Sequence, residues 1–447
     1  MISFKRIYER ILDKLTHLPN DKWKLSVLSA LPFWVGSFAV GLVAVFYAQL
    51  FGWAEEIFIY LVEEIHYWMF LITPILFIGS FLLVHKYAPY ANGSGIPQVT
   101  ASLELIQNRR SNRVIKLLSL PIILVKVGSS FLMALGGGII GREGPTIHIA
   151  GSIFKKIYDI LPDWWPRISP KNMIMTGAAA GLAAAFNTPL GGLVFAIEEL
   201  TKTHFNNFKH SIFIGVVIAG ITAQSTVGSY LYLGYPLAVN IGYGMVFAVV
   251  LSSLITGWFA GVYSRWVVAL ISWRKKLNFN KTLLFLAGIS VLITAMAIFM
   301  DHRIAGPGRE IILGSLFTSD KYLEWYVPIG KWVGSALCFS SGAAGGVFAP
   351  SLSIGASISA TISGILNLSP DNTNLLIMTG MVAFLTGITR SPFTSAILVL
   401  EMTDRHNLIF FFMLAALFGS IAAKSVFRKS LYEHIKEGIL QDFQKKQ

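Results

Sequence analysis

The sequence contains few charged residues and only one cysteine. Asp, Glu, Lys and Arg make up 13% of its 447 residues, whereas 54% are apolar, and the mean hydropathy is +0.63. Soluble domains carry about 25% charged residues, so the composition excludes an ordinary soluble protein. Cys338 has no second cysteine to pair with, which excludes a disulfide framework within the chain.

The sequence also lacks the short motifs of several enzyme classes. No HExxH, GxSxG or Walker motif occurs, and the nine histidines are scattered without metal-ligand spacing. The formal net charge of +13 comes from short basic clusters between uncharged runs, not from one continuous basic face. We therefore expect no enzymatic activity, no cofactor or metal, and no nucleic-acid partner.

Long runs without any charged residue indicate membrane spans. Such runs cover residues 25–54, 172–197, 211–264 and 332–370, and shorter ones cover 127–140, 282–300 and 407–423. A spanning helix needs about 20 apolar residues, so the run 211–264 holds at least two spans. No segment shows the alternating polarity of a transmembrane β-strand. The sequence predicts an all-α polytopic protein embedded in the lipid bilayer.

Residues 1–24 differ from the rest of the chain because they are charged and lack the apolar region of a cleavable signal. Ile7, Ile11 and Leu15 stand at helical spacing, which predicts an amphipathic helix at the membrane surface. We expect one transport domain to follow over 25–447. The positive-inside rule places most basic clusters and both termini in the cytoplasm. Only 15 residues follow Tyr432, so we expect no C-terminal soluble domain.

The chain contains a weak internal repeat. TGAAAGLAAAFNTPLGG, beginning at Thr176, matches TGMVAFLTGITRSPFTS, which begins 203 positions later at Thr379. Pro145 of GREGP and Pro350 of GVFAP coincide at an offset of 205. Many transporters consist of duplicated halves that bind their substrate between them, and here the halves would cover about 25–225 and 240–432. The alternative is a chance likeness between helices rich in small residues.

Three motifs interrupt the apolar pattern: GSGIP at 93–97, GREGP at 141–145 and GGVFAP at 345–350. Each places glycine before a proline that suits the first turn of a helix. The first N–H groups of a helix have no intrahelical partner, and its N-terminus attracts anions. Several N-termini at one place would hold an anion weakly enough to release it. The alternative for any one motif is a simple break between spans.

Glu143 lies inside GREGP, in a region otherwise free of acids. A carboxylate within the membrane costs at least about 2.5 kcal/mol, so we expect it to have a function. As a tethered anion it would compete with a mobile anion, and protonation would release it. The alternative is a salt bridge to Arg142.

Three more charged residues stand at the ends of, or within, apolar sequence. Glu198 and Glu199 are either solvated residues at a helix end or an entry point for protons. Lys126 would reach the membrane surface, pair with a carboxylate or raise the local positive potential.

These motifs resemble those of the CLC family of chloride channels and chloride/proton antiporters. GSGIP, GREGP and GGVFAP occur in the family's order, and a tyrosine follows in KSLYEHI. The resemblance covers about residues 25–432, nearly the whole chain. It implies tilted, partly discontinuous helices in two inverted halves, an ion path in each subunit of a homodimer, and the inner membrane of a bacterium.

The resemblance also implies roles for single residues. Ser94 and Tyr432 would donate hydroxyl hydrogen bonds to a central chloride ion, and Glu143 matches the outer gating glutamate. Glu199, the second of the paired acids, matches the inner proton glutamate of the antiporters. Backbone N–H groups would come from Gly95, Ile96, Val347 and Phe348.

Serine in GSGIP is the family's choice for chloride over nitrate, and the fluoride-exporting branch departs at both the serine and the tyrosine. We therefore predict an antiporter that exchanges chloride for protons. A passive chloride channel of the same fold is the alternative. Two positions depart from the family pattern: Ala344, where proline is common, and His148, where glutamine is frequent. We expect neither to touch an ion ligand, and His148 to affect the pH response of the outer vestibule.

Overall fold

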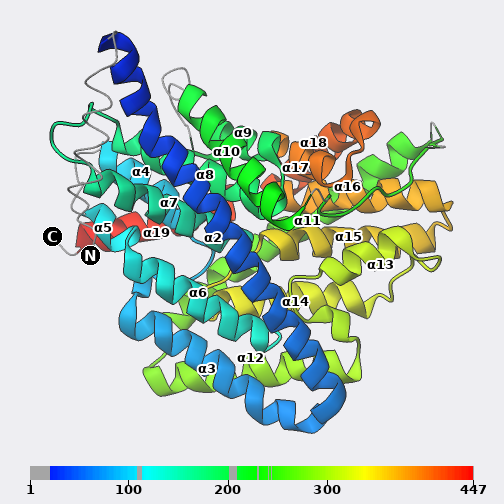
Figure 1. Cartoon of the computed structure of the whole chain (residues 1–447). Coiled ribbons are helices and arrows are strands. Elements are labelled where there is room, and N and C mark those ends of the chain that lie inside the picture. The colour runs from blue at the N-terminus through cyan, green and yellow to red at the C-terminus, as the bar shows by residue number, and fades with distance from the viewer. Residues whose placement is uncertain are drawn as a thin grey trace.

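The computed structural model of the chain consists of helices joined by short loops (Figure 1). It describes residues 21–107, 113–200, 209–228, 231–239, 241–242 and 244–445, and within these ranges no strand forms. This confirms the predicted all-α fold class. Residues 1–20, which hold most of the predicted amphipathic helix, lie outside the described ranges. The predicted boundary at residue 24 falls inside the first described helix, which already begins at Asp21.

The first half of the chain contains α2 (Asp21–Ile65), α3 (Met69–Tyr87), α4 (Ile96–Gln107), α5 (Val114–Leu117), α6 (Leu120–Leu135), α7 (Glu143–Ile160), α8 (Pro170–Phe186), α9 (Pro189–Phe195), the π-helical turn η4 (Ala196–Leu200) and α10 (Lys209–Val227). The second half contains α11 (Met245–Arg274), α12 (Phe279–Phe299), α13 (Arg309–Phe317), α14 (Tyr326–Ser340), α15 (Phe348–Ile365), α16 (Pro370–Thr389), α17 (Pro392–Thr403) and α18 (Ile409–Val426), and α19 (Leu431–Lys445) follows. Short 3₁₀ turns are η1 (His66–Trp68), η2 (Pro89–Ala91), η6 (His302–Ile304) and η7 (His406–Leu408).

Eight helical stretches of the described chain are long and apolar enough to cross a membrane. The charge-free run 211–264 resolves into α10 and α11, as the sequence predicted. The helices are unequal in length. The 45 residues of α2 extend about 68 Å, well beyond a hydrocarbon core of about 30 Å, so α2 is tilted or extends past the bilayer.

The two halves meet through reciprocal contacts. The N–H group of Gly141 donates to the carbonyl oxygen of Gly346, and the N–H group of Gly346 donates back to Gly141, both at 2.7 Å. These two residues occupy matching positions of the repeat. A contact in which each member makes the same bond to the other is what a two-fold axis between two copies produces. The duplication seen in the sequence is therefore also present in the fold.

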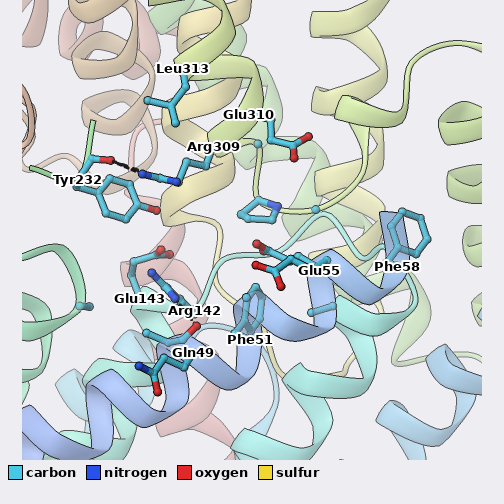
Figure 2. Close-up of a pocket in the computed structure, with 18 of the residues that line it drawn as sticks. Gln49, Phe51, Glu55, Phe58, Arg142, Glu143, Tyr232, Arg309, Glu310 and Leu313 are labelled. Atoms are coloured by element: carbon cyan, nitrogen blue, oxygen red, sulfur yellow. Dashed lines mark hydrogen bonds between the residues drawn. The ribbon is translucent and has the colours of Figure 1, made fainter. Parts of the chain in front are cut away.

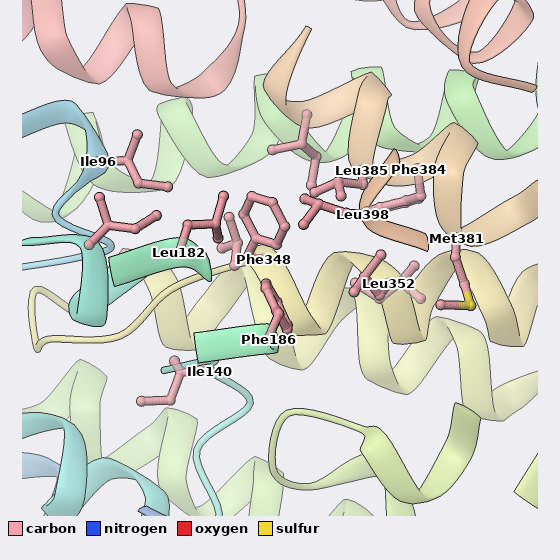
Figure 3. Packing of buried hydrophobic residues seen from close by; sticks show 14 of the residues in the cluster. Ile96, Ile140, Leu182, Phe186, Phe348, Leu352, Met381, Phe384, Leu385 and Leu398 are labelled. Atoms are coloured by element: carbon pink, nitrogen blue, oxygen red, sulfur yellow. The ribbon is translucent and has the colours of Figure 1, made fainter. Parts of the chain in front are cut away.

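Small residues let the central helices approach each other closely. α7 packs on α8 where Gly177 and Gly181 face Ala150, and α15 packs on α16 where Gly355 faces Gly380. Glycine and alanine favour such approach in membrane proteins because no side chain separates the backbones. Larger apolar side chains fill the space between the halves, as Figure 3 shows for Phe186, Phe348 and Leu182.

Candidate functional site

Each of the three glycine–proline motifs precedes or opens a helix. α4 begins at Ile96 of GSGIP, α7 at Glu143 of GREGP and α15 at Phe348 of GGVFAP. The motifs thus form the helix N-termini that the sequence predicted. Because an α-helix bonds its N–H groups to residues four positions earlier, the first N–H groups of all three helices point out of their own helix.

The three N-termini converge at one place in the protein. Gly144, in the first turn of α7, packs directly against the side chain of Ser94, so any side chain at position 144 would collide with it. On its other side the start of α7 lies against α15, since a Cβ atom at Gly141 would lie 3.2 Å from the backbone nitrogen of Ala349. Residues more than 200 positions apart in the sequence therefore surround one point.

Two hydroxyl groups face this point. Ser94 and Tyr432, in the first turn of α19, are each only 1% exposed. The two hydroxyls lie beside each other, and neither makes a hydrogen bond to any other group within the part of the chain that the structure describes. A buried polar group without a partner is costly, so a pair of such donors at one place indicates a binding site. An anion is the ligand that suits hydroxyl donors and helix N-termini together.

Glu143 lies at the other side of the same helix start, at the edge of a cavity of about 410 Å³ that we call the Glu143 cavity (Figure 2). Its side chain is 1% exposed, and Oε2 accepts no hydrogen bond within the described residues. The backbone N–H group of Ala349 lies beside the carboxylate. Arg142 donates to the carbonyl oxygen of Ala48 on α2. The carboxylate therefore occupies a helix N-terminus in the manner of a bound anion.

A second cavity of about 550 Å³ reaches Ser94 between the loop 89–94, the end of α11, the end of α14 and α19. We call it the Ser94 cavity. Among the described residues, none lines both cavities. Ser94 lines one cavity and Glu143 the other, and Gly144 beside Glu143 packs on Ser94, so the helix starts with the buried hydroxyls separate the two cavities.

The paired acids at the end of α9 have separate partners. Glu199 accepts a hydrogen bond from the hydroxyl of Ser391 at 3.0 Å. Glu198 accepts from the N–H groups of Phe393 and Thr394 at 3.3 and 2.8 Å, and thereby caps the N-terminus of α17. Both acids lie in the π-helical turn η4, a rare geometry that often marks functional positions. The solvated alternative for Glu198 is therefore wrong, because its carboxylate is held by a helix start.

Glu198 has a counterpart in the second half of the chain. Glu401 stands 203 positions later and accepts from the N–H groups of Leu190 and Gly191 at the start of α9. Each half thus caps a helix of the other half. The matching glutamates were visible in the repeat, but their capping role depends on contacts between halves that no local pattern shows.

Lys126 is fully buried and holds the GSGIP loop. Its Nζ donates to the carbonyl oxygens of Gly93 at 2.9 Å and Asn92 at 3.4 Å. It neither reaches the membrane surface nor pairs with a carboxylate within the described chain. Lys126 therefore fixes the backbone immediately before Ser94, a structural task that the sequence left open.

Lys331 is a second buried lysine, and sequence reasoning missed it. Its Nζ donates to four carbonyl oxygens at 2.8–3.2 Å, those of Arg303, Ile304, Ala305 and Gly306. It stands 205 positions after Lys126, the offset of the repeat, and this coincidence is the signal that could have identified it.

His148 does not lie where the sequence analysis placed it. It is absent from the lining of the Glu143 cavity, and its ring packs against Gly95, one of the predicted backbone ligands. Its Nε2 lies 2.8 Å from the carbonyl oxygen of Leu117. The expectation that His148 touches no proposed ligand was therefore wrong, whereas its effect on the pH response stays a prediction. Position 148 follows Glu143 by five residues, which turns its side chain about 140° around the axis of α7, toward Gly95.

Comparisons with known proteins agree with this fold. A family model described as voltage gated chloride channel matches residues 76–424. The fold is similar to the crystal structure of a slow cyanobacterial Cl⁻/H⁺ antiporter, with a TM-score of 0.80 and 23% identity over 93% of this chain and 98% of that one. A CLC-type fluoride/proton antiporter gives a TM-score of 0.73 and 21% identity over 93% and 98%. A eukaryotic CLC transporter gives 0.72 and 18% over 92% and 74%.

Proposed function

The chain belongs to the voltage gated chloride channel family, and we propose from this premise that it is an antiporter that exchanges chloride for protons. The observation that carries the proposal is Glu143, a buried carboxylate at the N-terminus of α7 beside the hydroxyl site. Anion and proton binding meet there. The likeness to solved antiporters supports the shared fold, and the chemistry rests on the residues of this chain.

In the proposed mechanism, chloride binds where the three helix N-termini converge. Ser94 and Tyr432 donate their hydroxyl hydrogen bonds to the ion, and backbone N–H groups complete the site. These backbone donors belong to Gly95, Ile96, Val347 and Phe348. Because only partial positive charges surround the ion, binding is favourable and escape remains fast.

Glu143 is the proposed outer gate. When charged, its carboxylate occupies the start of α7 and excludes chloride; when protonated, it loses its attraction to the N–H groups and leaves. A proton therefore enters Glu143 as chloride takes its place. This exchange at one position couples the two ions without any moving domain.

Glu199 is the proposed inner proton residue. A proton cannot easily follow chloride through helix N-termini that repel cations, so a separate entry is needed. Glu199 lies at the end of the uncharged run, while the neighbouring Glu198 is held as a helix cap. The presence of this acid favours the antiporter over the passive channel, which is the second candidate.

Several features of the assembly belong to the same proposal. The Ser94 cavity lies at the end of α11, where the basic cluster Arg274, Lys275 and Lys276 stands, so we assign it to the cytoplasmic side with both termini, and the Glu143 cavity to the outside. We propose a bacterial inner membrane and one transport domain over 25–447.

Large apolar side chains are exposed on α9, α10, α17 and α18: Leu190, Phe213, Ile221, Phe393 and Leu417. This surface is suited to a second copy of the chain or to lipid.

The test uses purified protein in liposomes with a chloride gradient. We expect chloride flow to drive protons uphill in the wild type. Glu143→Gln and Glu199→Gln should abolish proton movement while chloride still passes. Glu198→Gln is the matched control, since its carboxylate caps α17 and should not carry protons. Chloride flux in the wild type without any proton flux would establish the passive channel instead.

A further inference from the structure

Arg274 lies at the mouth of the Ser94 cavity, in the last turn of α11. Its guanidinium packs against Gly342, in the loop that leads from α14 to α15. A Cβ atom at Gly342 would lie 2.6 Å from Nη1 and 2.7 Å from Cζ, so the loop has room for the arginine only because this residue is glycine. Gly342 also has a φ of +90°, which disfavours any other side chain there.

The arginine is half-buried, yet no protein group receives its hydrogen bonds. Its Nε is shielded from solvent without a partner, and its side chain forms no hydrogen bond or ion pair with the rest of the described chain. The buried lysines behave differently, since Lys126 and Lys331 each donate to backbone carbonyl oxygens. A guanidinium carries five N–H donors, and here a half-buried one has a shielded Nε and no acceptor within the described chain, so it is available to a ligand.

The acids that line the same cavity do not neutralise it. Lys429 donates to both carboxylate oxygens of Glu437 at 2.7 Å, and this hydrogen bond lowers the pKa of the Glu437 carboxyl. Asp442 lies 3.7 Å from the Nζ of Lys275. Each acid is therefore paired with a lysine. The charge of Arg274 stays uncompensated, and it lies on the lining that also includes Ser94.

We propose that Arg274 is a chloride-docking residue that holds the ion at the mouth of the Ser94 cavity before it reaches Ser94 and Tyr432. The proposal rests on the proposed transport of chloride through this cavity, but not on proton coupling. The guanidinium fork offers N–H donors to the anion, and partial exposure keeps the binding weak enough for the ion to pass on.

A cation in the last turn also stabilises α11 through the helix dipole, so a control must share that effect. Lys275 is the C-cap residue of the same helix and lines the same cavity, but Asp442 lies beside it. It is therefore the matched control.

The experiment measures initial chloride flux through purified protein in liposomes as a function of chloride concentration. The variants are Arg274→Gln, Arg274→Lys and Lys275→Gln, and isethionate keeps the ionic strength constant. We expect Arg274→Gln to raise the chloride concentration for half-maximal flux about twofold to fivefold, with the maximal rate unchanged. Arg274→Lys should recover part of the affinity, and Lys275→Gln should match the wild type.

The effect should shrink as ionic strength rises, because salt screens an exposed charge. An unchanged half-maximal concentration in Arg274→Gln overturns the proposal, and so does a lower maximal rate alone, which would indicate a structural role. Proton flux is recorded in the same liposomes. If the wild type moves no protons, antiport is contradicted. The chloride measurement still decides the role of Arg274 in that case.

Discussion

The two halves of the chain use the same supports for different chemistry. Lys126 holds the loop that contains Ser94, and Lys331, 205 positions later, holds the loop that contains Pro307. Each loop also has two glycines around one residue, 213 positions apart between the loops, and their φ angles are nearly equal: 58° at Gly93 and 62° at Gly306, and 100° at Gly95 and 92° at Gly308. The duplication has therefore preserved the geometry of the loops together with the lysines that hold them.

The side chains proposed to act on ions have not been preserved between the halves. At the repeat offsets, Phe348 stands where the first half has Glu143, and Met402 stands where it has Glu199. Pro307 takes the place of Ser94 between the paired glycines. The proposed proton-binding residues and Ser94 thus come from the first half, while the other proposed hydroxyl donor, Tyr432, comes from α19 at the end of the chain. This asymmetry teaches that a duplicated scaffold can lose chemistry on one side without losing its fold.

The largest difference between the halves should appear when the buried lysines are removed. Lys331→Met removes the donor to four carbonyl oxygens. Lys126→Met removes a donor to only two, and these two also accept from Gln98 Nε2 and from the N–H group of Gly345. We expect Lys331→Met to lower the free energy of unfolding by about 3–5 kcal/mol and Lys126→Met to lower it by less. Thermal unfolding of the purified protein in detergent, followed by tryptophan fluorescence, measures both. The exposed Lys86 serves as control, since Lys86→Met should change little.

If both variants lose the same free energy of unfolding, the expected difference is wrong, because the number of unsatisfied carbonyl oxygens would then not determine the loss.

The spans, the helix starts and the position of Glu143 could be predicted from the sequence because each follows from a local pattern. Charge-free runs predicted α10 and α11, and glycine before proline predicted the N-termini of α7 and α15. The direction of His148, the cap made by Glu198 and the carbonyls around Lys331 could not be predicted. Each depends on which segment of the other half, or of a distant loop, packs against it, and that is decided by tertiary contacts.

The second comparison exchanges Ser94, which lies between Gly93 and Gly95, with Pro307, which lies between Gly306 and Gly308. Ser94→Pro gives the first half the residue of the second and removes a hydroxyl donor worth about 1.5–3 kcal/mol to a charged acceptor. We expect chloride binding, measured by calorimetry, to weaken at least tenfold, and nitrate flux to rise relative to chloride flux. Pro307→Ser is the reciprocal control and should leave chloride binding unchanged. If both variants bind chloride like the wild type, the ion binds elsewhere.

A smaller effect should follow from filling the close helix contacts. A Cβ atom at Gly380 would lie 2.5 Å from the carbonyl oxygen of Gly355, and one at Gly177 would lie 2.8 Å from that of Ala150. Both contacts are too close, so Gly380→Ala and Gly177→Ala should each destabilise the protein by about 1–3 kcal/mol, and the tighter Gly380 by more. Thermal unfolding under the same detergent conditions checks the order. If Gly177→Ala destabilises the protein more than Gly380→Ala, the contact between α15 and α16 accommodates an added methyl group more easily than the contact between α7 and α8.

The smallest effect concerns the caps that the halves exchange. Glu198 accepts three hydrogen bonds at the start of α17, and Glu401 accepts two at the start of α9. Loss of a helix cap costs about 0.5–2 kcal/mol, so Glu198→Ala and Glu401→Ala should each lower stability by that amount. Both variants should still drive protons uphill with chloride, because a cap has no part in proton transfer. If Glu198→Ala loses proton transport while Glu401→Ala keeps it, the two glutamates differ in function after all, and Glu198 rather than Glu199 would be the inner proton residue.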